Sequence, residues 1–138
     1  MASPSAAWCA TATGGDGAGF PPAFLDGVRL FNARQFFEAH EAFEELLDDV
    51  EEDGRWDLLV ALIQVAVGYH KLASGYDGAP RMLGLGLEKL RPFPATAWTV
   101  DVEGLRTRVA EDVAALAAGA DAAEARLSTD PPRIAVRR

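Results

Sequence analysis

The segment from Trp56 to Ser74 constrains the fold most, because its residues are apolar nearly all the way round a helix. Only Asp57, Gln64 and Lys71, spaced by seven residues, form a polar stripe along it. A helix that is apolar on most sides needs neighbours on several sides. We therefore expect this segment to lie at the centre of a helical bundle and to be its most buried element.

The rest of the central chain repeats its apolar residues at helical spacing, and no segment shows the alternation of a strand. Short connectors between successive helices favour antiparallel neighbours. The sequence therefore predicts an all-α fold, a compact array of four to five helices built from antiparallel helical hairpins. Gly84 and Gly86 are interpreted as sites of close helix packing. Five helices are expected. The first begins at Pro21-Pro22, and the second and third cover about 35–53 and 56–74. The fourth runs from Pro80 to before Pro92, and the fifth follows a cap at Asp101.

The two ends of the chain differ in composition from the centre. Residues 1–20 are rich in Ala, Gly, Ser and Thr, and residues 119–138 combine Ala with a Pro pair and terminal arginines. Such segments offer few apolar side chains to bury. We predict a disordered N-terminal tail at 1–20, a helical domain at 21–118 and a flexible C-terminal tail at 119–138.

Charge and composition narrow the class of protein. The acidic net charge of −8 is concentrated between Glu38 and Asp57, where ten acids accompany one base, Arg55. This run predicts a solvated helix face and argues against nucleic-acid binding. No apolar stretch approaches the roughly 20 residues that span a bilayer. Residues 1–19 lack the parts of a secretory signal, and Cys9 is the only cysteine, so we expect a cytoplasmic protein without a membrane segment.

One pair of residues suggests chemistry. His40 lies inside the apolar arc of its predicted helix, and Glu44, one helical turn further on, lies at the edge of that arc, so their side chains can meet and are expected to be at least partly buried. An antiparallel hairpin centred on Gly54 pairs residues whose numbers sum to about 108. Glu44 then faces Gln64, which could donate a hydrogen bond to it. His40 faces Gly68, whose small size would leave room for a water, an ion or a ligand.

The segments 37–46 and 62–71 resemble the bacterial and archaeal family catalogued as domain of unknown function 309, whose motif is His-x-x-x-Glu-x-x-Trp/Tyr. The resemblance implies an all-helical domain without an established activity, in which the motif His and Glu are suspected metal ligands. By position these are His40 and Glu44. The chain departs from the family at Leu47, where the family has Trp or Tyr, and at Arg34, where it often has Gly.

Several functions are compatible with the pair. A zinc protease with Glu41 as base is disfavoured, because the second ligand histidine is missing. A site for a divalent cation (zinc, manganese or iron) from His40, Glu44 and either Gln64 or His70 is an alternative, and a set with His70 would suit zinc or iron better than one with Gln64. Acid–base catalysis by the same pair is another alternative. The favoured interpretation is a buried pair that fixes helix packing in a scaffold that binds another protein.

Overall fold

The computed structural model describes residues 20–136, and this part of the chain is almost entirely helical. The predicted tail at 1–20 lies outside the described residues except for Phe20, which is buried and stacks on Phe24 with ring centroids 4.3 Å apart. The elements are α2 (Ala23–Asn32), α3 (Phe36–Glu45), the 3-10 turn η1 (Leu47–Asp49), α4 (Arg55–Ser74), α5 (Ala79–Leu90), β1 (Thr96–Ala97), β2 (Val100–Asp101), α6 (Val102–Ala118) and α7 (Ala120–Thr129).

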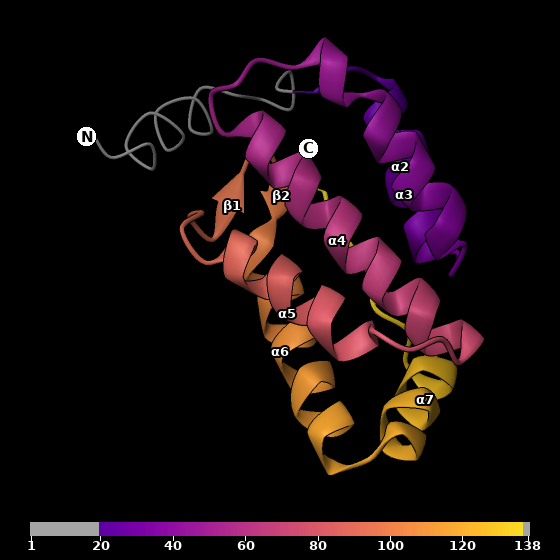
Figure 1. Cartoon of the computed structure of the whole chain (residues 1–138). Helices are drawn as coiled ribbons and strands as arrows, with labels where there is room; N and C mark the ends of the chain where they lie inside the picture. Colours follow the sequence, from indigo (N-terminus) through magenta and orange to yellow (C-terminus); the bar gives the residue numbers. More distant parts are fainter. Residues whose placement is uncertain (1–19, 137–138) are drawn as a thin grey trace.

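Helix α4 runs through the middle of the array, as Figure 1 shows. It packs against α3 on one side and α5 on the other, α2 packs on α3, and α6 packs on α5. Helix α7 packs on α6 and returns to contact α4. More residues are buried on α4 than on any other helix in the described part of the chain. The predicted all-α array of helical hairpins is confirmed, and so is the central place of α4.

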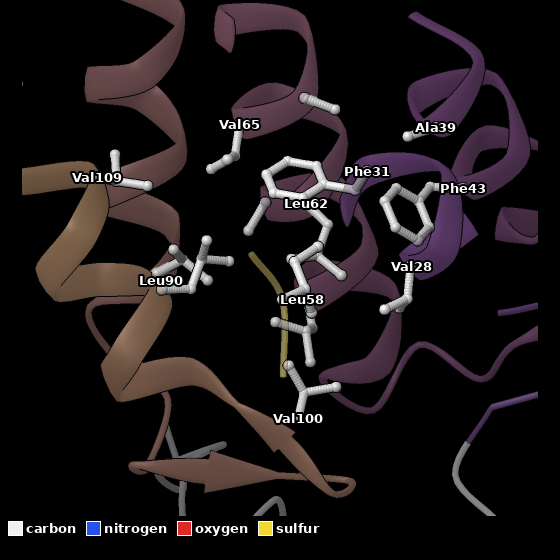
Figure 2. Packing of buried hydrophobic residues seen from close by; sticks show 14 of the residues in the cluster. Val28, Phe31, Ala39, Phe43, Leu58, Leu62, Val65, Leu90, Val100 and Val109 are labelled. Atoms are coloured by element: carbon white, nitrogen blue, oxygen red, sulfur yellow. The ribbon is translucent and has the colours of Figure 1, made fainter. Parts of the chain in front are cut away.

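The core joins both halves of this array. Figure 2 shows Phe31 and Phe43 from the first helices beside Leu58 and Leu62 of α4, and all four are fully buried. Val100 and Val109 extend the same cluster to β2 and α6 (Figure 2). Burying each large apolar side chain stabilises the fold by about 1.5–3 kcal/mol. The helices are therefore held mainly by one continuous apolar interior.

Helices α4 and α5 approach closely at glycines. A Cβ atom on Gly86 would lie 2.6 Å from Cγ2 of Val65, so the prediction of close packing is confirmed there. It is wrong for Gly84, where a Cβ would meet nothing within 4 Å. A Cβ on Gly68 would lie 2.7 Å from Cγ of Leu83. Gly68 therefore serves contact with α5, and the predicted space opposite His40 is wrong.

The turn between α2 and α3 is tight although it contains no glycine. Arg34 has a φ of 66°, in the left-handed region that favours glycine. Its N–H donates to the Phe31 carbonyl at 2.9 Å, and the N–H of Gln35 donates to the Leu30 carbonyl at 2.9 Å. These are the two hydrogen bonds of a Schellman motif. The turn is kept at a conformational cost of roughly 1 kcal/mol for the non-glycine residue.

The segment 119–138, predicted to be a flexible tail, packs on the core as far as the structure describes it. Helix α7 buries Ala123 and Leu127, and Ile134 beyond it is also buried. The Asn32 side chain donates to the Ile134 carbonyl at 3.0 Å and accepts from its N–H at 2.7 Å. The prediction is wrong because a few well-placed apolar residues and a side-chain amide suffice to dock a segment of polar composition.

A small hairpin was also not predicted. Strands β1 and β2 have two residues each and are joined by Trp98 and Thr99, whose φ angles are 46° and 69°. Two-residue turns with positive φ at both positions usually contain Asn or Gly. Trp98 is 1% exposed, and its ring lies 6.1 Å from that of Phe20 and 6.3 Å from that of Phe93. Burial of the indole therefore overrides the local preference of the turn.

Candidate functional site

His40 occupies the edge of the α3–α4 interface. Its side chain is 16% exposed, whereas that of Glu44 is 55% exposed. The inward face of α3 is formed by Phe36, Ala39 and Phe43, which are buried. The expectation of a partly buried pair thus holds for His40 and is wrong for Glu44, which extends into solvent.

The hydrogen bond of His40 indicates which ring nitrogen carries a proton. Nδ1 lies 2.5 Å from the carbonyl oxygen of Phe37. Because a carbonyl oxygen only accepts, Nδ1 carries the proton and donates it, which leaves Nε2 of a neutral ring as an acceptor. Nε2 lies 3.7 Å from Oε1 of Glu44, beyond direct hydrogen-bond distance. In the neutral ring, Nε2 and Oε1 are two electron-rich atoms that face each other, and either a proton on Nε2 or a bound cation would link them.

The other residues predicted around the pair do not complete it. Within residues 20–136, no hydrogen bond joins Gln64 to His40 or Glu44, and Oε1 of Gln64 is buried without a partner. Glu41 is exposed, and Leu47 is half-buried in η1 against the apolar core. At the third motif position, where the family has Trp or Tyr, Leu47 thus contributes only apolar packing.

His70 contributes to a surface cluster instead. The ring of Phe37 lies 4.8 Å from that of His40 and 5.2 Å from that of His70, and His70 lies 5.7 Å from Tyr76. Phe37 and Tyr76 are 45% and 62% exposed. These four residues, here called the aromatic patch, bring the two histidines of the chain onto one surface through Phe37. His70 itself is half-buried.

The ligand set predicted for zinc, manganese or iron is not assembled. In the part of the chain that the structure describes, no group of three or more His, Cys, Asp or Glu side chains is placed to hold a metal ion. His70 contacts the Phe37 and Tyr76 rings, while His40 approaches Glu44. These residues offer at most the two-atom arrangement of Nε2 and the Glu44 carboxylate.

Acidic side chains cover α3 and the segment after it. The single base of the run, Arg55, forms an ion pair with Asp53 at 2.7 Å. The predicted solvated face is confirmed, because most acids of the run are exposed. The exposed acids are Glu38, Glu41, Glu44, Glu45, Asp48, Asp49, Glu51 and Glu52.

A second polar cluster, absent from the sequence-based predictions, lies in the interior. Asp112 of α6 is 1% exposed. Its Oδ2 accepts from the Tyr69 hydroxyl at 2.6 Å and from Nε of Arg108 at 2.7 Å. Its Oδ1 accepts from Nε of Arg126 at 2.8 Å. This Asp112 network joins α4, α6 and α7, and its carboxylate is satisfied by three donors, which indicates a structural role.

Tyr69 remains a neutral donor in this network. Burial, followed by the negative charge of Asp112, raises the pKa of its hydroxyl far above the usual range.

One signal in the sequence could have revealed the network. Asp112 lies three residues after Val109 and directly before Val113, among the apolar residues that recur at helical spacing from Leu105 to Leu116. A charged residue in such a pattern indicates a buried, paired carboxylate.

The fold and the site define a small all-helical domain with an exposed aromatic patch, an acidic helix face and an internal ion network. No helix in the described part of the chain has the length and apolar character required to cross a membrane. Residues 24–83 match the family described as Domain of unknown function (DUF309), so the resemblance found in the motif residues is confirmed over these residues. The match runs from α2 to the first part of α5 and includes the aromatic patch. No curated protein matches the chain.

Proposed function

We propose that this domain is an interaction module that binds a basic protein segment on the aromatic patch. The observation that carries the proposal is the exposure of Phe37 and Tyr76, which are linked through ring contacts with His70. Exposed aromatic side chains are enriched where proteins bind one another, because they offer a large contact area at little cost in conformational entropy.

The charge around the patch indicates the chemistry of the partner. Glu38, Glu41 and Glu44 are exposed on the same helix as Phe37, and the acidic run continues beyond them. A lysine or arginine of the partner would be attracted by these carboxylates and would also interact favourably with the faces of aromatic rings. An apolar side chain of the partner would cover Phe37. A basic segment with interspersed apolar residues fits this surface.

Binding of a peptide of alternating lysine and leucine tests the proposal. We expect F37S and Y76S each to weaken binding at least about tenfold, as loss of a central aromatic contact usually costs more than 1 kcal/mol. Fluorescence polarisation of the labelled peptide measures the effect. L85S is the matched control, because Leu85 is 40% exposed on α5 and belongs to no ring contact of the patch.

The control separates the patch from general attraction to an acidic protein. Added salt should weaken binding of the wild type, since the acids contribute through long-range charge. Equal affinities of F37S, L85S and the wild type would overturn the proposal, as would stronger binding of an acidic peptide of the same length.

The geometry of His40 favours one alternative function, a metal-binding protein or a metal-dependent or acid–base enzyme. Its Nε2 faces the Glu44 carboxylate while Nδ1 is fixed by the Phe37 carbonyl, which is how many metal-binding histidines are oriented. Water, a substrate or a partner would have to supply the remaining ligands.

Thermal melts with and without zinc or manganese test this alternative. We expect neither metal to change the unfolding midpoint appreciably, because two ligands, one of them mostly exposed, form a weak site. A metal at one hundred times its dissociation constant would add about 2.7 kcal/mol to the free energy of unfolding. A gain of that size in the wild type that H40A abolishes would establish the metal site instead.

A further inference from the structure

A small pocket lies beside the α2–α3 turn, where α3 begins. The α2–α3 turn, the first residue of α3, the end of α4 and one face of α7 line this pocket, which is open to solvent and has a volume of about 210 Å³. Phe36 and Leu127, both buried, form its apolar part. Ligand pockets usually measure roughly 300–1,000 Å³, so this one suits a molecule of few atoms. Its lining residues are Arg34, Phe36, Ala73, Glu124, Leu127 and Ser128.

Opposite charges flank this pocket without neutralising each other. Arg34 lines it from the α2–α3 turn and Glu124 lines it from α7, and both are exposed. Neither side chain forms an ion pair or a hydrogen bond with another residue between 20 and 136. The pocket therefore offers one cation and one anion to a ligand, together with the hydroxyl of Ser128.

The backbone of Arg34 has an unfavourable conformation, which suggests that its side chain has a role at the pocket. The left-handed conformation would be adopted at lower cost by glycine, yet an arginine is held there at the pocket. Residues in costly conformations cluster at binding sites, where the side chain is needed in one position. The N–H groups of the first turn of α3 have no side-chain cap and start beside the same pocket, at Phe36.

We propose that the pocket binds a small amphoteric molecule, a free α-amino acid with an aliphatic side chain. Its carboxylate pairs with the Arg34 guanidinium near the start of α3, and its ammonium group pairs with Glu124. The aliphatic group covers Phe36 and Leu127, and Ser128 adds a hydrogen-bonding group. This occupant matches the two unpaired charges and the apolar lining at once, whereas a simple anion would leave Glu124 opposed to it.

Isothermal titration of the full chain with L-alanine and L-leucine tests the assignment. R34G and E124Q should each weaken binding at least about tenfold, because each removes one charge-assisted contact. Acetate and methylammonium, which carry only one of the two charges, should bind more weakly than L-alanine by a similar factor. R91Q is the matched control, since Arg91 is an exposed arginine after α5 that does not line the pocket.

The R34G variant also separates binding from folding. Relief of the left-handed conformation should raise its unfolding midpoint by about 3 °C, so weaker binding cannot be attributed to a damaged fold. Unchanged affinity of R34G or E124Q would overturn the proposal. So would acetate binding as tightly as L-alanine, which would indicate an anion site, or no heat with either amino acid at millimolar concentration.

Discussion

Replacement of Asp112 by alanine should lower the free energy of unfolding by about 3–5 kcal/mol, the usual cost of breaking a buried ion pair by removing one partner. The variant would leave the Tyr69 hydroxyl and the Arg108 guanidinium without the acceptor that each now contacts within 2.7 Å. It would also remove one of the two contacts by which Arg126 holds α7 against α6, leaving the one with Glu111. Urea denaturation followed by circular dichroism measures the change.

Two variants isolate the contribution of the buried carboxylate. E111A removes the neighbouring exposed acid, which contacts Arg126 at 3.1 Å, and should change stability by less than about 0.5 kcal/mol. Y69F removes one hydrogen bond and leaves the two arginine contacts, so it should cost about 1 kcal/mol. If D112A were no less stable than E111A, the network would not hold the helices together.

Most helices could be predicted from the sequence because their determinants are local. Because α4 is apolar on nearly all sides, it had to lie at the centre. The Asp101 side chain caps α6 by accepting from the Gly104 N–H at 3.0 Å. Gly75 ends α4 with a φ of 73°, as a glycine after a helix commonly does. Each of these features acts within a few residues of the chain.

The candidate site was predictable only in part, because it depends on how helices rotate against each other. The spacing of His40 and Glu44 placed them on one helix face. It did not show that Phe36, Ala39 and Phe43 take the inward position, which leaves Glu44 in solvent. Prediction of the aromatic patch would have required the exact register between α3 and α4. Counting residues from the centre of the hairpin does not give that register with single-residue accuracy.

The Asp112 network and the docked C-terminal segment depend on partners distant in the sequence. Tyr69 and Asp112 are separated by 43 residues, and Asn32 and Ile134 by 102. No local periodicity reports such contacts. The polar composition of 119–138 indicated a tail because composition does not show where the few apolar side chains fall.

A chain that ends at Ala118 should lose more than about 5 kcal/mol of its free energy of unfolding. Burial of Leu127 and Ile134 would be lost, at about 1.5–3 kcal/mol each. Asp112 would lose the Arg126 donor, and the Asn32 amide would lose both of its backbone hydrogen bonds. Small domains are stable by only about 5–15 kcal/mol, so this truncated chain should be largely unfolded or close to it at room temperature.

Milder variants show which part of the segment matters. N32A keeps the segment but leaves the N–H and carbonyl of Ile134 without their side-chain partner, so it should cost about 1–3 kcal/mol. R133A changes an exposed side chain between these anchors and should leave the unfolding midpoint within about 1 °C. Urea unfolding curves of all three chains give the comparison. A chain ending at Ala118 that unfolds at the same urea concentration as the full chain would mean that α7 and Ile134 contribute no net stability, despite the burial that the structure assigns to them.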